Sequence, residues 1–358
     1  MIKKIAFFAG VAAVIAAAVH VKKYMDEPEK KSKFRALMDL HLHLDGSLSV
    51  SSVKELAKMQ NIDLPSDTEL KKKLTVSQKC RDLNEYLEKF EFPLSLLQTR
   101  EALSVAVYNL CEELKEQGLI YAEIRFAPLL HTKNGLSIHD AVSACIDGLN
   151  QSDFKAGLIL CCMRSDSEHE NNMETIKAAK DFLGKGVYAV DLAGAEGLYP
   201  TRDFEDLFAH AGELGVPFTI HAGEAAGPES IMAALKFGTK RIGHGVAAAN
   251  SPKLMKKLAE EGITLELCPS SNMQTKIFSD ISEFPLRKLM NAGVKVTINT
   301  DNMTVSHTTL ENEFELLDSE FLLSDNEIKK LLLNSVNACF ASEKTKKLLK
   351  KIIISEYK

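Results

Sequence analysis

Residues Met38 to Leu48, MDLHLHLDGSL, contain two histidines one residue apart and an aspartate two positions later. If this stretch is a β-strand, alternate side chains leave the same face, so His41, His43 and Asp45 would point the same way. Neutral imidazole and carboxylate are normal ligands of a divalent metal ion. The stretch therefore indicates either a site or an unusually polar strand face, and residues elsewhere in the chain decide between the two.

Three later segments have similar residues at the ends of apolar runs. His221 and Glu224 stand in HAGE, His244 stands in RIGHGV, and Asp301 and Asn302 stand in NTDN. Catalytic groups of parallel barrels lie at the carboxyl ends of the strands. We therefore expect these side chains to meet at one rim of the fold.

Eight short apolar runs alternate with longer helical segments after residue 36. The runs predict strands over residues 37–45, 119–128, 155–163, 187–194, 216–224, 241–246, 263–272 and 294–302. The segments between them have apolar residues at a spacing of three to four and often end at a glycine, as helices do. This alternation predicts an α/β protein with a (β/α)8 TIM barrel, and with extra helices between strands one and two, from Ser52 to about Gln117.

The metal chemistry follows from four of these residues. His41, His43, His221 and Asp301 provide three imidazoles and one carboxylate, which suit one zinc ion with a position left for water. Such an ion lowers the pKa of its water towards about 7 and provides a nucleophile at neutral pH. The residues therefore predict a metal-dependent hydrolase.

Two further residues are candidates for moving protons. His244 is not needed as a ligand, so we expect it to act as a base for the water or as an electrostatic partner of the attacking oxygen. Glu224, three residues after His221, would face the substrate, and a partly buried carboxyl group with a raised pKa suits proton donation.

Composition limits the alternatives. The 358 residues, 45% of them hydrophobic, suffice for one barrel-sized domain or two smaller ones. The net charge of -5 argues against nucleic acid as the main partner. The seven cysteines form no CxxC pair and most lie in apolar segments, which favours reduced core cysteines over disulfides.

The N-terminal segment suggests attachment to a membrane. Residues 5–21 are mostly apolar or small and are flanked by lysines, so residues 1–23 predict an anchor, followed by a charged tether (24–36) and the catalytic domain (37–358). A cleaved signal segment and a buried helix are the alternatives. Because more Lys and Arg follow the apolar run than precede it, we expect a membrane-anchored protein with a cytoplasmic catalytic domain, and a secreted form as the alternative.

The motifs HLHLDG, HAGE, RIGHG, SSNMQT and NTDN, in this order, resemble those of the bacterial-type adenosine deaminases within the amidohydrolase superfamily. The resemblance extends from about Met38 to Phe340. It implies hydrolysis of adenosine and 2′-deoxyadenosine to the inosine form and ammonia, in purine salvage. It also implies one zinc ion per subunit, held by His41, His43, His221 and Asp301.

The same resemblance implies roles around the substrate. Glu224 would protonate purine N1, His244 would assist the water, Asp45 would bind the ribose 5′-hydroxyl, and the backbone N–H of Gly194 would face N3. The segment LNEYLEKF is similar to the family's lid, and the residues that would cover the nucleoside are Leu83, Tyr86, Leu87 and Phe90. An amphipathic helix that only packs against the body is the alternative for this segment.

Asn302 departs from many family members, which have an aspartate there. Purine N7 accepts a hydrogen bond, so an aspartate must carry a proton to contact it, whereas an asparagine amide donates directly. The change fits a purine and leaves open the preference among adenosine, deoxyadenosine and modified nucleosides.

Other functions are less consistent with the residues. Two-metal hydrolases resembling dihydroorotases commonly need a modified lysine at the end of strand four, where this chain has DLAG. The H-x-E and P-C-x-x-C motifs of cytidine deaminases are absent, so a polynucleotide is not expected as substrate. A deaminase of adenine or of a 5′-modified adenosine remains an alternative. A catalytically silent, tethered binding protein is the other, although every ligand and the proton carrier are present.

Overall fold

The computed structural model describes residues 32–77 and 79–358. Residues 1–33 and 34–358 form separate units, and all the described helices and strands belong to the second. Within the described residues the strands are β1 (Met38–His43), β2 (Tyr121–Phe126), β3 (Ala156–Met163), β4 (Val187–Ala193), β5 (Ile220–Ala222), β6 (Arg241–His244), β7 (Thr264–Leu267) and β8 (Lys295–Ile298). Each lies within one of the ranges expected from the sequence.

All neighbouring strands pair in parallel. The sheets have the orders β1-β2-β3-β4 and β5-β6-β7-β8. Isolated parallel bridges join their edges, one between Val190 and Phe218 and the other between Leu42 and Asp301. The predicted α/β class with parallel strands is therefore confirmed.

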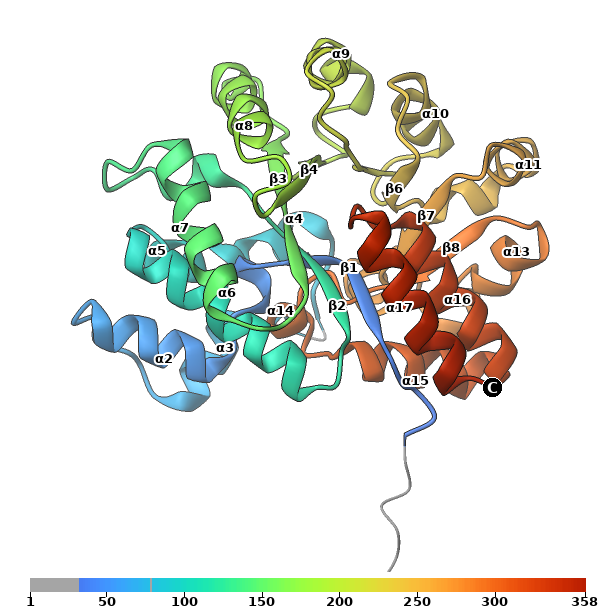
Figure 1. The fold of residues 1–358 in the computed structure, drawn as a ribbon, viewed down its shortest axis with the longest axis horizontal. Coiled ribbons are helices and arrows are strands. Elements are labelled where there is room, and N and C mark those ends of the chain that lie inside the picture. The colour runs from blue at the N-terminus through green and yellow to red at the C-terminus, as the bar shows by residue number, and fades with distance from the viewer. Residues whose placement is uncertain (1–31, 78) are drawn as a thin grey trace, which may run out of the picture. The chain divides into compact units, whose positions relative to one another are not determined.

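Helices connect the strands and lie outside them (Figure 1). Between β1 and β2 lie α2 (Val50–Met59), α3 (Asp67–Leu74), α4 (Leu83–Leu87), α5 (Glu91–Leu96) and α6 (Arg100–Glu116), which is the extra helical content expected there. The later helices are α7 (Ile138–Gln151), α8 (His169–Asp181), α9 (Glu205–Glu213), α10 (Pro228–Lys236), α11 (Pro252–Glu261), α12 (Pro269–Gln274), α13 (Leu286–Asn291), α14 (Met303–Ser306), α15 (Leu310–Phe321), α16 (Asp325–Ala338) and α17 (Glu343–Glu356). Short 3-10 turns are η1 (Asp45–Ser47), η2 (Glu88–Phe90), η3 (Pro128–His131), η4 (Thr201–Phe204), η5 (Val246–Asn250) and η6 (Ile281–Glu283).

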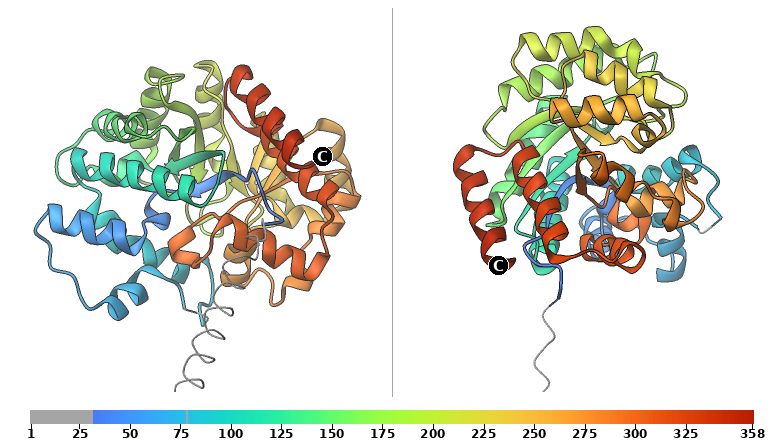
Figure 2. Two further views of the ribbon diagram at one scale, coloured as in Figure 1. Left: turned by 60° about the horizontal axis from the view of Figure 1, so that its bottom comes forward. Right: turned by 90° about the vertical axis from the view of Figure 1, so that its right-hand side faces the viewer.

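Local sequence explains where helices begin. In α7, Ser137 and Asp140 cap each other's backbone N–H groups, and Ser324 and Glu327 do the same at the start of α16. The last two helices, α16 and α17, pack side by side (Figure 2), and α16 also contacts β8 and β1. The end of the chain therefore helps to hold the first and last strands together.

The strands are buried on both faces, as expected for parallel strands covered by helices. All six residues of β2, YAEIRF, are buried, including Glu123 and Arg125. Arg125 bonds Asp191 on β4 and Glu266 on β7, so its side chain lies between the two sheets. A network of buried ion pairs thus lies inside the ring of strands.

The expected membrane localisation is wrong for the part of the chain that the structure describes. No helix among residues 32–77 and 79–358 has the length and apolar composition needed to cross a bilayer. The longest of them, α6, has 17 residues, about 25 Å of helix against the roughly 30 Å of a hydrocarbon core. The N-terminal hydrophobic helix of residues 1–23, with its apolar run 5–21, lies outside the described residues.

Candidate active site

A cavity of about 230 Å³ lies at the carboxyl ends of the strands. Of the residues predicted to form the site, those that line it are His43, Asp45, Leu83, Tyr86, Leu87, Phe90, Gly194, His221, Glu224, His244, Asp301 and Asn302. His41 is fully buried beside them. Segments from both ends of the chain therefore meet at one place, as the strand-end pattern predicted.

The candidate metal ligands lie against one another. Asp301 Oδ1 is 3.5 Å from His41 Nε2 and 3.4 Å from His43 Nε2, and His43 Nε2 is 3.3 Å from His221 Nε2. Two ligand atoms of a tetrahedral zinc ion, each about 2.05 Å from the metal, are roughly 3.3 Å apart. The observed separations match this value, and His41 Nε2 is buried without a hydrogen-bond partner. The donor set therefore fits a divalent metal ion.

A second grouping of donors overlaps the first. One ligand atom from each of His41, His221, His244 and Asp301 lies within 4.8 Å of the other three. This set contains His244 in place of His43. Both sets share His41, His221 and Asp301, so these three residues are common to either arrangement.

Carboxylates behind two imidazoles fix the direction of the rings. Glu266 Oε2 lies 2.9 Å from His41 Nδ1, and Asp191 Oδ2 lies 2.8 Å from His221 Nδ1. With Nδ1 facing a carboxylate, Nε2 is left to face the metal position. The Arg125 guanidinium donates a hydrogen bond to each of these carboxylates, at 2.9 Å to Glu266 and 2.8 Å to Asp191. We did not identify Asp191, Glu266 or Arg125 from the sequence; the available signal was a charged residue inside an otherwise apolar strand.

Asp301 is held next to β1 by its backbone. Its N–H donates to the His41 carbonyl at 2.8 Å, and its carbonyl accepts from the His43 N–H at 2.7 Å. Asp301 and His244 have φ values of +61° and +56°, which non-glycine residues seldom adopt and which concentrate at functional sites. Burial opposes ionisation, but His41 and the other nearby imidazoles hold the pKa of Asp301 below its usual value. The aspartate is therefore ionised, the form that binds metal.

Glu224 and His244 face each other beside the ligands. Glu224 Oε2 is 3.6 Å from His244 Nε2. Burial, and then the charges of Asp301 and Glu196, raise the pKa of Glu224 well above its usual value. Burial lowers the pKa of His244 well below its usual value, and Nδ1 of this ring lies 3.2 Å from the side-chain amide of Asn272. These surroundings thus favour the protonated form of Glu224 and the neutral form of His244.

The predicted lid lies over the cavity in α4 and η2. Tyr86 is buried, and its hydroxyl lies 2.6 Å from the Ser306 hydroxyl at the end of α14. Val76, before the lid, donates its N–H to the Val305 carbonyl at 2.9 Å. The lid is therefore attached to the helix that directly follows Asn302. Contact of the lid with a nucleoside stays a prediction.

Some lining residues were missed at the sequence level. They are Leu94, Ala127, Leu130, Cys161, Met163 and Ala193. Most of them stand at the carboxyl ends of β2, β3 and β4, so position on a strand was the available signal. Their apolar side chains give the cavity a surface suited to a flat aromatic ring.

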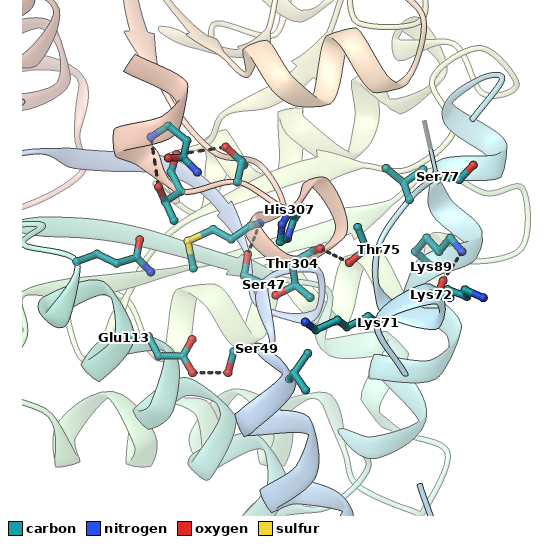
Figure 3. A pocket seen from close by; sticks show the side chains of 17 residues that line it. Ser47, Ser49, Lys71, Lys72, Thr75, Ser77, Lys89, Glu113, Thr304 and His307 are labelled. Atoms are coloured by element: carbon teal, nitrogen blue, oxygen red, sulfur yellow. Dashed lines mark hydrogen bonds between the residues drawn. The ribbon is translucent and has the colours of Figure 1, made fainter. Parts of the chain in front are cut away.

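A larger hollow of about 920 Å³ lies apart from these residues. Figure 3 shows its lining, which includes Lys71, Lys72, Lys89 and His307, with Glu113 bonded to Ser49. None of the predicted site residues lines it. The smaller cavity is therefore the one that contains the chemistry.

Comparison with known proteins gives consistent matches. A family model described as adenosine deaminase matches residues 36–356. The adenosine deaminase of Haemophilus ducreyi is 53% identical over 323 residues, covering 87% of this chain and 94% of that protein. The adenosine deaminase of Enterococcus faecalis is 41% identical over 335 residues, covering 92% and 99%. Among solved structures, an adenine deaminase from Arthrobacter aurescens superimposes with a TM-score of 0.82 at 26% identity, covering 90% of this chain and 99% of that one.

Proposed function

The chain belongs to the adenosine deaminase family and deaminates adenosine, and we propose that it does so with one zinc ion held by His41, His43, His221 and Asp301. The main support is the convergence of these donors from β1, β5 and the turn after β8, with His41 and His43 at 3.5 and 3.4 Å from Asp301, and His43 at 3.3 Å from His221. The parallel strands, bridged at both sheet edges, support the (β/α)8 barrel as their framework. When bound, the zinc ion supplies a water of lowered pKa as the nucleophile for adenine C6.

His43 fits the fourth ligand position better than His244. Its Nε2 lies at ligand-to-ligand distance from both His221 and Asp301. His244 instead has Nδ1 beside Asn272 and Nε2 beside Glu224, so both of its nitrogens have other partners. We therefore propose that His244 assists the attacking water and that His43 is the fourth metal ligand.

Glu224 delivers a proton to the purine ring. Addition of an oxygen at C6 moves electrons onto N1, which needs a proton at that moment. The raised pKa favours the protonated form of the Glu224 carboxyl, which is the form that can donate this proton. The His244 imidazole, 3.6 Å from Glu224, would assist the water as a base or as an electrostatic partner of the attacking oxygen.

Other residues orient the nucleoside. Asp45 lines the cavity and accepts a hydrogen bond from the ribose 5′-hydroxyl, and the backbone N–H of Gly194 faces purine N3. Asn302 donates its amide to N7. Gly46 makes room for this amide, since a Cβ at position 46 would lie 1.9 Å from Asn302 Oδ1. Leu83, Tyr86, Leu87 and Phe90 cover the base.

The alternatives differ in what they leave unexplained. A deaminase of free adenine has no use for Asp45, which lines the cavity and whose pKa burial raises to about 6. A 5′-modified adenosine lacks the 5′-hydroxyl that would donate a hydrogen bond to this carboxylate. A catalytically silent binding protein has no need of an acid and a base beside a complete ligand set.

An ultraviolet assay tests the proposal. The full chain, loaded with zinc, is given adenosine, 2′-deoxyadenosine, adenine and 5′-deoxyadenosine in parallel. We expect rapid conversion of the first two and little of adenine. Conversion of adenine alone would overturn the nucleoside assignment, and full activity after removal of all metal would overturn the zinc assignment.

A further inference from the structure

Glu196 lies just past the end of β4 and has no role in the reaction as described so far. Its side chain is buried, with 2% of its surface exposed. It accepts hydrogen bonds from four consecutive backbone N–H groups and one hydroxyl. The donors are Gly223 at 2.7 Å, Glu224 at 3.0 Å, Ala225 at 2.7 Å, Ala226 at 3.0 Å and the Ser230 hydroxyl.

This arrangement fixes the loop that carries Glu224. A buried carboxylate is costly unless its oxygens are hydrogen-bonded, and successive backbone N–H groups form a concave site for an anion. Gly223 begins the turn with φ of +72°, and a Cβ there would lie 2.5 Å from the Ile231 side chain. Moving the Glu224 backbone would therefore break several hydrogen bonds to one buried charge.

The same network reaches the metal ligand His221. The Ser230 hydroxyl lies 2.7 Å from the Thr201 hydroxyl. Arg164 donates to that hydroxyl at 2.9 Å and to the His221 carbonyl at 2.6 Å. The segment from His221 to Ala226 is thus held at both ends by buried side chains from outside it.

We propose that Glu196 is a positioning residue for Glu224, holding its backbone so that the carboxyl group meets purine N1. The inference rests on the proton-transfer role given to Glu224 above. Glu196 would then have a role parallel to that of Asp191, which lies nearby in the sequence on β4. Asp191 orients the metal ligand His221, and Glu196 orients the proton donor Glu224. The charge of Glu196 further helps to keep the Glu224 carboxyl protonated.

The test begins with Glu196→Gln in the full chain. An amide cannot accept from all five donors, so the loop loses its fixed position. We expect kcat to fall by about 10- to 100-fold, as for other residues that orient a catalytic group. KM for adenosine should change by less than about twofold, with one zinc ion still bound per chain. Ser230→Ala, which removes a single donor, should lower kcat by a smaller factor with the same unchanged KM and metal content.

Glu113→Gln is the matched control. Glu113 is also a carboxylate that binds hydroxyls, those of Ser49 and Ser52, but it lies outside the catalytic cavity. We expect wild-type kcat from this variant. A fall in kcat equal to that of Glu196→Gln would show a general effect of removing such a carboxylate and would overturn the proposal.

A double-mutant comparison separates positioning from general damage. In a Glu224→Gln background, Glu196→Gln should lower the remaining rate by less than about twofold, because the residue through which it acts is already disabled. An equal loss in both backgrounds, a loss of zinc, or wild-type kcat in Glu196→Gln and Ser230→Ala would each overturn the proposal. High activity in Glu224→Gln alone would instead refute the function proposed for Glu224.

Discussion

Glu224 Oε2 and His244 Nε2 lie 3.6 Å apart at the wall of the cavity, and their surroundings shift their pKa values in opposite directions. Burial is the first cause in both cases, since it disfavours the charged form of each. Burial therefore favours the protonated carboxyl group and the neutral imidazole, which is the pattern expected of an acid and a base in one site.

Replacement of the acid tests the proton donor directly. Glu224→Gln should lower kcat by about 100- to 10,000-fold, because an amide cannot deliver a proton. Zinc content, measured by atomic absorption, should stay at one ion per chain. Loss of zinc together with activity would place Glu224 among the ligands.

Metal content distinguishes the two overlapping ligand sets. His43→Ala and His221→Ala should both lose zinc and activity, whereas His244→Ala should keep zinc and lose most of its activity. The reason is that the Nε2 atoms of His43 and His221 lie 3.3 Å apart, at tetrahedral ligand separation, whereas Nε2 of His244 lies beside Glu224. Retention of zinc by His43→Ala and loss by His244→Ala would reverse the assignment. A chelator should abolish wild-type activity, and added zinc should restore it.

Asn302→Asp should make adenosine binding depend on pH. Only a protonated carboxyl can donate to N7, and burial beside Asp301 raises the pKa of such a group. At low pH the variant should bind like the wild type, and KM should rise by roughly tenfold or more as pH rises and the carboxyl ionises. Steady-state kinetics between pH 5 and 9 provide the measurement. An unchanged KM at every pH would show that residue 302 does not donate a hydrogen bond to purine N7.

Asp45 should discriminate among substrates by their 5′ group. Asp45→Ala should raise KM for adenosine by about tenfold or more, the usual loss for a hydrogen bond to a charged group. KM for 5′-deoxyadenosine should stay the same, because this analogue lacks the hydroxyl. An equal rise in KM for both substrates would indicate that Asp45 stabilises the cavity and does not bind the 5′-hydroxyl.

Glu313 should make the stability of the fold depend on pH. This carboxylate is buried, accepts from the Ser270 N–H at 2.9 Å and the Thr308 hydroxyl at 2.6 Å, and has its pKa raised from 4.5 to about 7 by burial. At pH values between 4.5 and about 7, Glu313 is therefore protonated in the folded state and ionised in the unfolded state. The free energy of unfolding should fall as pH rises from 4.5 to 7, by up to about 3 kcal/mol, and then level off.

Glu313→Gln provides the comparison, because an amide stays neutral at every pH, although its single oxygen can replace only one of the two carboxylate oxygens that accept from Ser270 and Thr308. The stability of this variant relative to the wild type should therefore rise between pH 4.5 and pH 8, by urea unfolding at each pH. A stability difference that does not vary with pH would contradict the raised pKa.

The residues proposed as metal ligands could be selected from sequence because they stand near the ends of recognisable strands. His41, His221 and Asp301 end apolar runs, and parallel strands bring such ends to one rim. The supporting side chains could not be found in this way. Asp191 and Glu266 are remote in sequence from the imidazoles that they orient, and only the closure of the strands brings them together.

Strand lengths were overestimated where polar or proline residues end a strand early. Residues 263–272 were expected to be one strand, but β7 ends at Leu267 and Pro269 begins α12. Proline has no N–H for the sheet and fits the first turn of a helix, which explains the change. Glu196 was missed because its partners are backbone N–H groups, which no side-chain pattern reveals.

The backbone bonds between Asp301 and β1 join residues that are about 260 positions apart. A ribosome releases His41 and His43 long before it makes their aspartate partner. The proposed ligand set can therefore be complete only after residue 301 has been made and has docked against β1. A product truncated before Asp301 should, for that reason, be inactive towards adenosine.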